Sequence, residues 1–124
     1  MKTLLIVDDE RDVRDIIRMR LTKNPTYRIL EAAGGQDALE LIRREHPALV
    51  ILDWLMPGVS GKDVLKTLRD DPTLADIPVI MMTVKGEQSA QAEGEALGIS
   101  AYLIKPFDGD LLMGKVQEAL HEPR

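Results

Sequence analysis

The chain of 124 residues has no cysteine, which excludes disulfides, zinc–thiolate sites, iron–sulfur clusters and thiol catalysis. It also has no apolar run near the roughly 20 residues that span a bilayer. The first ten residues, MKTLLIVDDE, have too short an apolar stretch for a signal peptide and end in acids. We therefore expect a cytoplasmic protein with no membrane partner.

Positive charge is also scarce. The sequence has 16 basic and 21 acidic residues, and its formal net charge is −5. We therefore expect no direct binding to nucleic-acid phosphates by this chain. The balance of 44% hydrophobic and 30% charged residues is that of an ordinary globular protein. The length fits a single domain over residues 1–124, and residues 121–124 resemble the start of a tail or linker.

Short apolar runs alternate with segments of helical period. Four runs are apolar on both faces, as strands covered on both sides should be, and a fifth, more mixed run suits an edge strand. The four are residues 4–7, 49–52, 79–82 and 102–104, and the mixed run is 27–31. The alternation predicts an α/β fold, a flavodoxin-like doubly wound (βα)5 unit with a parallel five-stranded sheet in the order 2-1-3-4-5.

The sequence predicts where one of the intervening helices begins and where another ends. Ser60 with Asp63 three residues later is a capping-box pattern, which predicts that a helix begins there. The segment 87–97 has the weakest helical pattern, because it is mostly Ala, Gln and Glu and contains Gly94. Gly98 is the expected C-terminal cap of that helix.

The chemistry-bearing residues follow the strands. In an open parallel sheet, ligands bind beyond the carboxyl ends of the strands, where the strand order reverses. Asp8 and Asp9 follow the first strand, Asp53 the third, Thr83 the fourth and Lys105 the fifth. Asp53 ends a fully apolar strand, where an unpaired carboxylate would be costly. The sequence thus predicts one acidic crevice at this end of the sheet.

Three carboxylates in one crevice repel one another, at about 4 kcal/mol per close pair at an effective dielectric of 20. Lys105 offsets part of this repulsion, and a divalent cation would offset more. Hard oxygen ligands without Cys or His favour Mg²⁺, with Mn²⁺ as a substitute. Such a site suits phosphoryl transfer, with Asp53 as the nucleophile that forms an aspartyl phosphate.

These residues resemble the receiver domain of two-component response regulators over nearly the whole chain. The resemblance is carried by the acidic pair after the first strand, the acceptor in DWLMPGVSG, a hydroxyl after the fourth strand and a Lys-Pro pair after the fifth. In this sequence those residues are Asp8, Asp9, Asp53, Thr83 and Lys105 with Pro106.

The resemblance implies a phosphorelay switch rather than a turnover enzyme. Asp53 would accept a phosphoryl group from a sensor histidine kinase or a histidine phosphotransfer protein. Asp9 and Asp53, with the backbone carbonyl of Leu55, would bind Mg²⁺, and Asp8 would act directly or through water. Lys105 and Thr83 would contact the phosphoryl group, and Tyr102 would turn inward behind Thr83. The family also implies a cis bond between Lys105 and Pro106.

One position departs from the family pattern, and one face is the expected output. Val84 stands where receivers usually have a very small residue, so we expect it to crowd the acceptor site. The weakly anchored helix 87–97 is the element that phosphorylation should bias most easily. We therefore expect the output partner or domain to bind a face formed by this helix, the fifth strand and the last helix.

Three other functions compete with this interpretation. A phosphatase of the haloacid dehalogenase type would need Asp-x-Asp on the first strand and a longer chain, whereas this strand ends in DDE. A flavodoxin-like cofactor carrier would need a glycine- and hydroxyl-rich phosphate loop in place of those acids. A receiver-like interaction module that never takes phosphate stays open, because of Val84.

Overall fold

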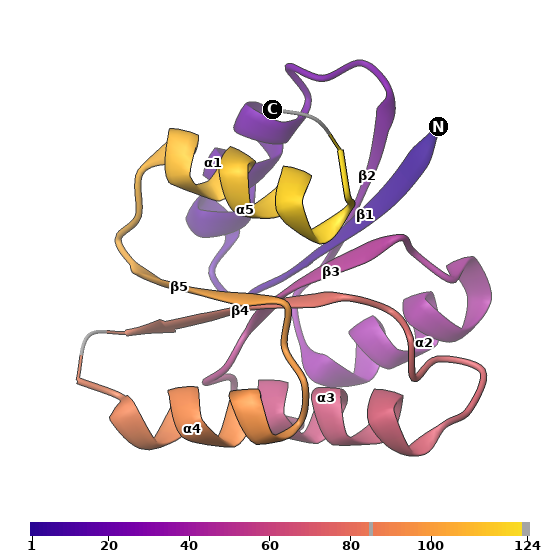
Figure 1. Cartoon of the computed structure of the whole chain (residues 1–124), viewed down its shortest axis with the longest axis vertical. Helices are drawn as coiled ribbons and strands as arrows, with labels where there is room; N and C mark the ends of the chain where they lie inside the picture. The colour runs from indigo at the N-terminus through magenta and orange to yellow at the C-terminus, as the bar shows by residue number, and fades with distance from the viewer. Residues whose placement is uncertain (85, 123–124) are drawn as a thin grey trace.

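The computed structural model describes residues 1–84 and 86–122, and five strands alternate with five helices along it (Figure 1). The elements are β1 (Lys2–Val7), α1 (Arg11–Leu21), β2 (Tyr27–Ala32), α2 (Gly35–Glu45), β3 (Leu49–Asp53), α3 (Gly61–Asp70), β4 (Val79–Val84), α4 (Gln88–Ala96), β5 (Ala101–Lys105) and α5 (Gly109–Ala119).

The strands form one parallel sheet in the order β2-β1-β3-β4-β5. This confirms the predicted flavodoxin-like fold. Helices α1 and α5 cover one face of the sheet, and α2, α3 and α4 cover the other (Figure 1). The strand order reverses between β1 and β3, so their carboxyl ends flank the crevice where this fold binds ligands.

Strand alternation divides the apolar side chains between two cores. In β1, Leu4 and Ile6 face α1 and α5, while Leu5 and Val7 face the other three helices. All five residues of β3 are buried. At about 25 cal/mol per Å² of apolar surface, these two cores supply the main force that holds the strand ends in place.

The structure contains the helix features that the sequence predicted. The Ser60 hydroxyl accepts from the Asp63 amide and the Asp63 carboxylate from the Ser60 amide, both at 3.2 Å, which completes the capping box. Gly98, just beyond α4, has a φ of +83°. Among the described side chains of α4 only Ala90 and Gly94 are buried, so α4 is weakly anchored as expected.

The chain beyond α5 stays attached to the sheet as far as it is described. Glu122 accepts a hydrogen bond from Lys2 at 2.6 Å and another from the Tyr27 hydroxyl. Within the predicted tail or linker, residues 121–124, Glu122 is therefore attached to β1 and β2, and residues 123–124 lie outside the described part. Within that part, no helix has the length and apolar character needed to cross a bilayer.

Candidate functional site

Asp8 lies at the centre of the site, fully buried just beyond β1. Its carboxylate accepts a hydrogen bond from the Glu10 amide at 2.8 Å and one from Lys105 Nζ at 2.6 Å. The lysine comes from the end of β5, on the far side of two intervening strands. Its long side chain thus spans the gap, as the sequence predicted, and joins the two ends of the crevice.

Asp53, at the end of β3, is 5% exposed. One carboxylate oxygen lies 3.4 Å from Lys105 Nζ, so the ammonium group contacts both Asp8 and Asp53. Burial and then the charge of Asp8 raise the pKa of Asp53 to about 7, against the opposing effect of Lys105. The site therefore carries more negative charge than one lysine balances.

The charge excess also acts on Lys105. Its burial lowers its pKa, but the hydrogen bond to Asp8 and the charge of Asp53 outweigh this effect, so the pKa of Lys105 is raised. The lysine is therefore firmly protonated, and it offers a fixed positive charge to any anion that enters the crevice.

Asp8, Asp9 and Glu10 form the acidic cluster beside this pair. Each offers a carboxylate oxygen, and the three oxygens lie within 4.8 Å of one another. Asp9 and Glu10 are exposed, so solvent reaches the cluster. Asp9 also contributes to the raised pKa of Asp53. Sequence reasoning assigned Glu10 to the start of α1, and the structure adds its carboxylate to the cluster as well.

The donor set fits a hard divalent cation. It consists of carboxylate oxygens from buried Asp8 and from exposed Asp9 and Glu10, so a bound ion could keep water ligands, as Mg²⁺ usually does. Burial and then the charges of Asp8 and Asp9 raise the pKa of Asp53, so a cation nearby would favour its ionised form. The cluster of Asp8, Asp9 and Glu10 could therefore hold a cation such as Mg²⁺.

Thr83, near the end of β4, is 4% exposed. Among the buried side-chain polar atoms of the described residues, its hydroxyl oxygen is the one without a hydrogen-bond partner. An unpaired buried hydroxyl is unfavourable, so it marks a donor that a ligand could satisfy. Thr83 and Tyr102 line a small cavity of about 50 Å³ beside α4.

Leu55 and Val84 are exposed apolar residues close in the sequence to the crevice residues Asp53 and Thr83. The Leu55 side chain is 53% exposed and the Val84 side chain 45% exposed. Val84 pairs with Lys105 between β4 and β5, and both line an apolar groove beside α1. The Lys105–Pro106 peptide bond is cis, as the resemblance implies.

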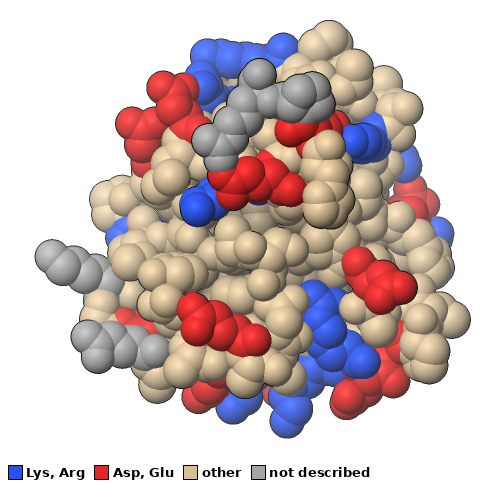
Figure 2. Space-filling view, in the orientation of Figure 1, with Lys and Arg blue, Asp and Glu red and all other residues tan. Residues whose placement is uncertain are grey.

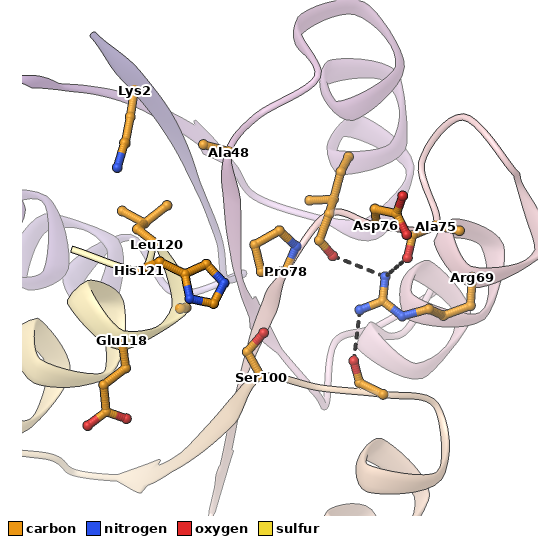
Figure 3. A pocket seen from close by; sticks show the side chains of 13 residues that line it. Lys2, Ala48, Arg69, Ala75, Asp76, Pro78, Ser100, Glu118, Leu120 and His121 are labelled. Carbon is orange, nitrogen blue, oxygen red and sulfur yellow. Dashed lines mark hydrogen bonds between the residues drawn. The ribbon is translucent and has the colours of Figure 1, made fainter.

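A larger hollow, of about 780 Å³, lies at the opposite end of the sheet (Figure 3). Its most prominent cation, Arg69, donates to the carbonyl oxygens of Leu97 and Gly98 at 2.9 Å and of Ala75 and Ile77 at 3.0 Å. The guanidinium is thus engaged in holding the chain around α3 and α4 together, and it does not serve as an anion site.

The comparisons with known proteins identify the family and support the fold. A family model described as the response regulator receiver domain matches residues 4–117. The chain belongs to this family. Receiver domains of response regulators are signalling switches of two-component systems and are generally not classed as enzymes, and the family typically uses Mg²⁺.

Two curated relatives show the context in which similar receivers occur. The phosphate regulon transcriptional regulatory protein PhoB of Pseudomonas aeruginosa is 39% identical over 119 residues, which cover 96% of this chain and 52% of PhoB. Response regulator Rre1 of Synechocystis is 36% identical over 95% of this chain and 51% of its own length. The receiver spans about half the length of these relatives.

A solved structure matches the chain end to end. The chemotaxis protein CheY4 of Vibrio cholerae superposes with a TM-score of 0.88 at 28% identity, covering 97% of this chain and 99% of that one. The receiver fold therefore occurs both within longer regulators and as a chain of this length.

Proposed function

We propose that this receiver is a phosphorelay switch in which Asp53 accepts a phosphoryl group from the phosphohistidine of a sensor histidine kinase or a histidine phosphotransfer protein. We place this exchange in the cytoplasm and treat residues 1–124 as one receiver module. The observation that carries the proposal is that Lys105 contacts both Asp8 and Asp53, while the Thr83 hydroxyl on β4, the strand between β3 and β5, is buried and unpaired.

The transfer step follows from these positions. An ionised oxygen of Asp53 attacks phosphorus, the new O–P bond forms, and the P–N bond of the donor breaks with its electron pair returning to the imidazole. Lys105 balances the charge on the phosphoryl oxygens, and Thr83 donates its hydroxyl proton in a hydrogen bond to one of them. Asp8, Asp9 and Asp53, with the Leu55 carbonyl, would hold Mg²⁺. That ion, when bound, neutralises charge on the phosphoryl group.

The phosphodonor has a suitable surface next to the site. An apolar groove of about 360 Å³ lies between α1 and the ends of β4 and β5, and Lys105 forms part of its wall. Ile16 and Met19, on the outer face of α1, are each 66% exposed. A partner that buries these side chains would bring its reactive group beside Asp53.

The output surface is proposed to consist of α4, β5 and α5. Helix α4 is weakly anchored, and the cavity between Thr83 and Tyr102 gives both side chains room to move. Ile104 on β5 and Leu111 on α5 are 44% and 50% exposed and border a hollow of about 380 Å³. Phosphorylation adds about one negative charge at Asp53, enough to shift such an element without refolding the core.

Charge on the visible surface agrees with a protein partner for this module. On the face shown in Figure 2, lysine and arginine side chains are interspersed with acids and form no single basic patch. We propose that DNA binding, where a longer regulator needs it, is a task of the attached output part.

Trp54 fluorescence tests the proposal directly, because this single tryptophan is 4% exposed and adjoins the acceptor. We expect the signal to respond first to Mg²⁺ and then to beryllofluoride or a small phosphodonor. Asp53→Asn should abolish the second response, and mass spectrometry should detect one phosphoryl group on the wild type alone. A wild type that binds Mg²⁺ but never gains phosphate would contradict the proposal and favour an interaction module.

Amide exchange tests the output face. Phosphorylation should change exchange rates most in α4, β5 and α5. Changes confined to α1 and α2 would exclude this assignment, even if Asp53 is phosphorylated.

A further inference from the structure

Arg14 links three elements behind the acidic cluster. From α1, its Nη1 donates to the main-chain carbonyl oxygen of Asp8 at 2.7 Å, and its Nε donates to Glu31 Oε1 at 3.3 Å. Glu31 lies on β2 and pairs in register with Ile6 of β1. The Arg14 side chain is only 15% exposed, so the contact is shielded from water.

The Asp8 carbonyl belongs to the peptide unit that leads into Asp9. The other polar groups of Asp8 are already paired: its amide donates to the Ala32 carbonyl at 3.2 Å, and its carboxylate accepts from Glu10 and Lys105. The bond from Arg14 completes this set. It fixes the plane of the Asp8–Asp9 peptide, and with it the direction in which the Asp9 side chain leaves the chain.

We propose that Arg14 is a positioning residue for the metal site. Through the Asp8 carbonyl it holds the loop after β1 in the conformation that brings the Asp8 and Asp9 carboxylates together. Glu31 in turn holds the guanidinium in place. This inference rests on the proposed function, because it assumes that the acidic cluster binds a divalent cation.

Arg18 provides a matched control within the same network. It lies one turn further along α1 and donates to the same carboxylate, at 2.8 Å to Glu31 Oε2, and also to Asp15 at 2.9 Å. No hydrogen bond from Arg18 to Asp8 is found among the described residues. Replacement of either arginine therefore removes one positive charge and one bond to Glu31, but only replacement of Arg14 frees the Asp8 carbonyl.

The sign of the effect separates positioning from simple electrostatics. Removing a positive charge near a dication should by itself tighten metal binding, because the like-charge repulsion is lost. If Arg14 acts by positioning, its loss should weaken binding instead. Arg18→Met should show only the electrostatic effect.

The experiment measures Mg²⁺ affinity by Trp54 fluorescence for the wild type, Arg14→Met and Arg18→Met. We expect Arg14→Met to bind Mg²⁺ about tenfold more weakly, and Arg18→Met to bind it as tightly as the wild type or slightly more tightly. Arg14→Gln, too short to reach the Asp8 carbonyl, repeats the comparison if the Met variant does not fold.

A second measurement needs no metal. The Glu10 amide is bonded to the Asp8 carboxylate, so its hydrogen exchange in EDTA reports the order of the loop. Exchange should be several-fold faster in Arg14→Met than in Arg18→Met, although both should lose similar stability to urea. Such a difference cannot come from a general loss of stability.

The outcomes are distinct. A wild type whose fluorescence does not respond to Mg²⁺ would contradict the proposed metal site itself. With a responsive wild type, equal or tighter binding by a folded Arg14 variant would overturn the role of Arg14. Equal weakening in both arginine variants would also overturn it, because the shared pairing with Glu31 would then carry the effect.

Discussion

Asp53 is a buried carboxylate with a raised pKa, and removing its charge should stabilise the metal-free protein. Burial and the neighbouring Asp8 raise the pKa of Asp53 from 3.8 to about 7. An Asp53→Asn variant keeps the size of the side chain but carries no charge. We expect it to be more resistant to urea than the wild type above neutral pH in EDTA.

The pH dependence follows from linkage. Because the folded pKa is raised, the folded state binds more protons than the unfolded state between pH 4 and pH 7, and wild-type stability falls as pH rises through that window. The pKa of Asp53 rises from 3.8 in the unfolded chain to about 7 in the folded one. At about 1.4 kcal/mol per pH unit, the charge of Asp53 can therefore lower the free energy of unfolding by at most about 4 kcal/mol. Since the variant also loses the Lys105 contact, we expect a net gain of about 2 kcal/mol at pH 8 and under about 1 kcal/mol at pH 5.

Urea unfolding followed by Trp54 fluorescence measures both values. Asp37→Asn is the control, because Asp37 is exposed on α2, and its free energy of unfolding should change by less than about 0.5 kcal/mol at either pH. An advantage of Asp53→Asn that is the same at pH 5 and pH 8 would refute the reasoning, since the effect would then not come from ionisation.

Three further perturbations probe the rim and the backbone of the site. Val84→Ala should speed phosphorylation by small donors, because it removes bulk beside Lys105, and equal rates for the two proteins would show the crowding idea to be wrong. Lys105→Met should raise the pKa of Asp53 further, which pH-dependent Trp54 fluorescence would detect, and an unchanged midpoint would count against the ion pair. Gly61→Ala should destabilise the fold by about 3 kcal/mol, because its Cβ would overlap the Asp53 carbonyl and approach Trp54 Cα to 2.8 Å. Gly114→Ala on α5 has open space and should instead gain up to about 1 kcal/mol in urea unfolding, and equal effects for the two glycines would exclude this steric account.

The fold could be predicted from the sequence because most of its strands are apolar on both faces, whereas its helices are apolar on one face only. The run at 4–7 predicted β1, although the observed strand begins earlier, at Lys2. Lys2 and Thr3 belong to it because their main chains pair with Tyr27 and Arg28. Hydropathy does not report main-chain hydrogen bonding, so a prediction based on apolar runs misses the polar ends of strands.

The site was accessible for a related reason. The acids, the threonine and the lysine lie at or just beyond the carboxyl ends of strands, and the sheet order brings these ends together. Contacts to main-chain atoms were not accessible. Arg14 bonds the Asp8 carbonyl and Arg69 bonds four carbonyls, but every residue has a carbonyl, so no residue type marks the partner. The sequence did contain one indication of the role of Arg14. An arginine one turn into a helix after an acidic loop, with Glu31 on the adjacent strand, could have been predicted to contact that loop.

The same charges decide stability and function in this receiver. Asp8 and Asp53 are buried against one another with one lysine between them, an arrangement that costs free energy in the absence of a cation. A ligand that relieves this cost binds the folded state alone and stabilises it, by about 2.7 kcal/mol at a hundred times its Kd. Substitutions that neutralise the crevice should therefore raise stability in EDTA and remove the stabilisation by Mg²⁺ together.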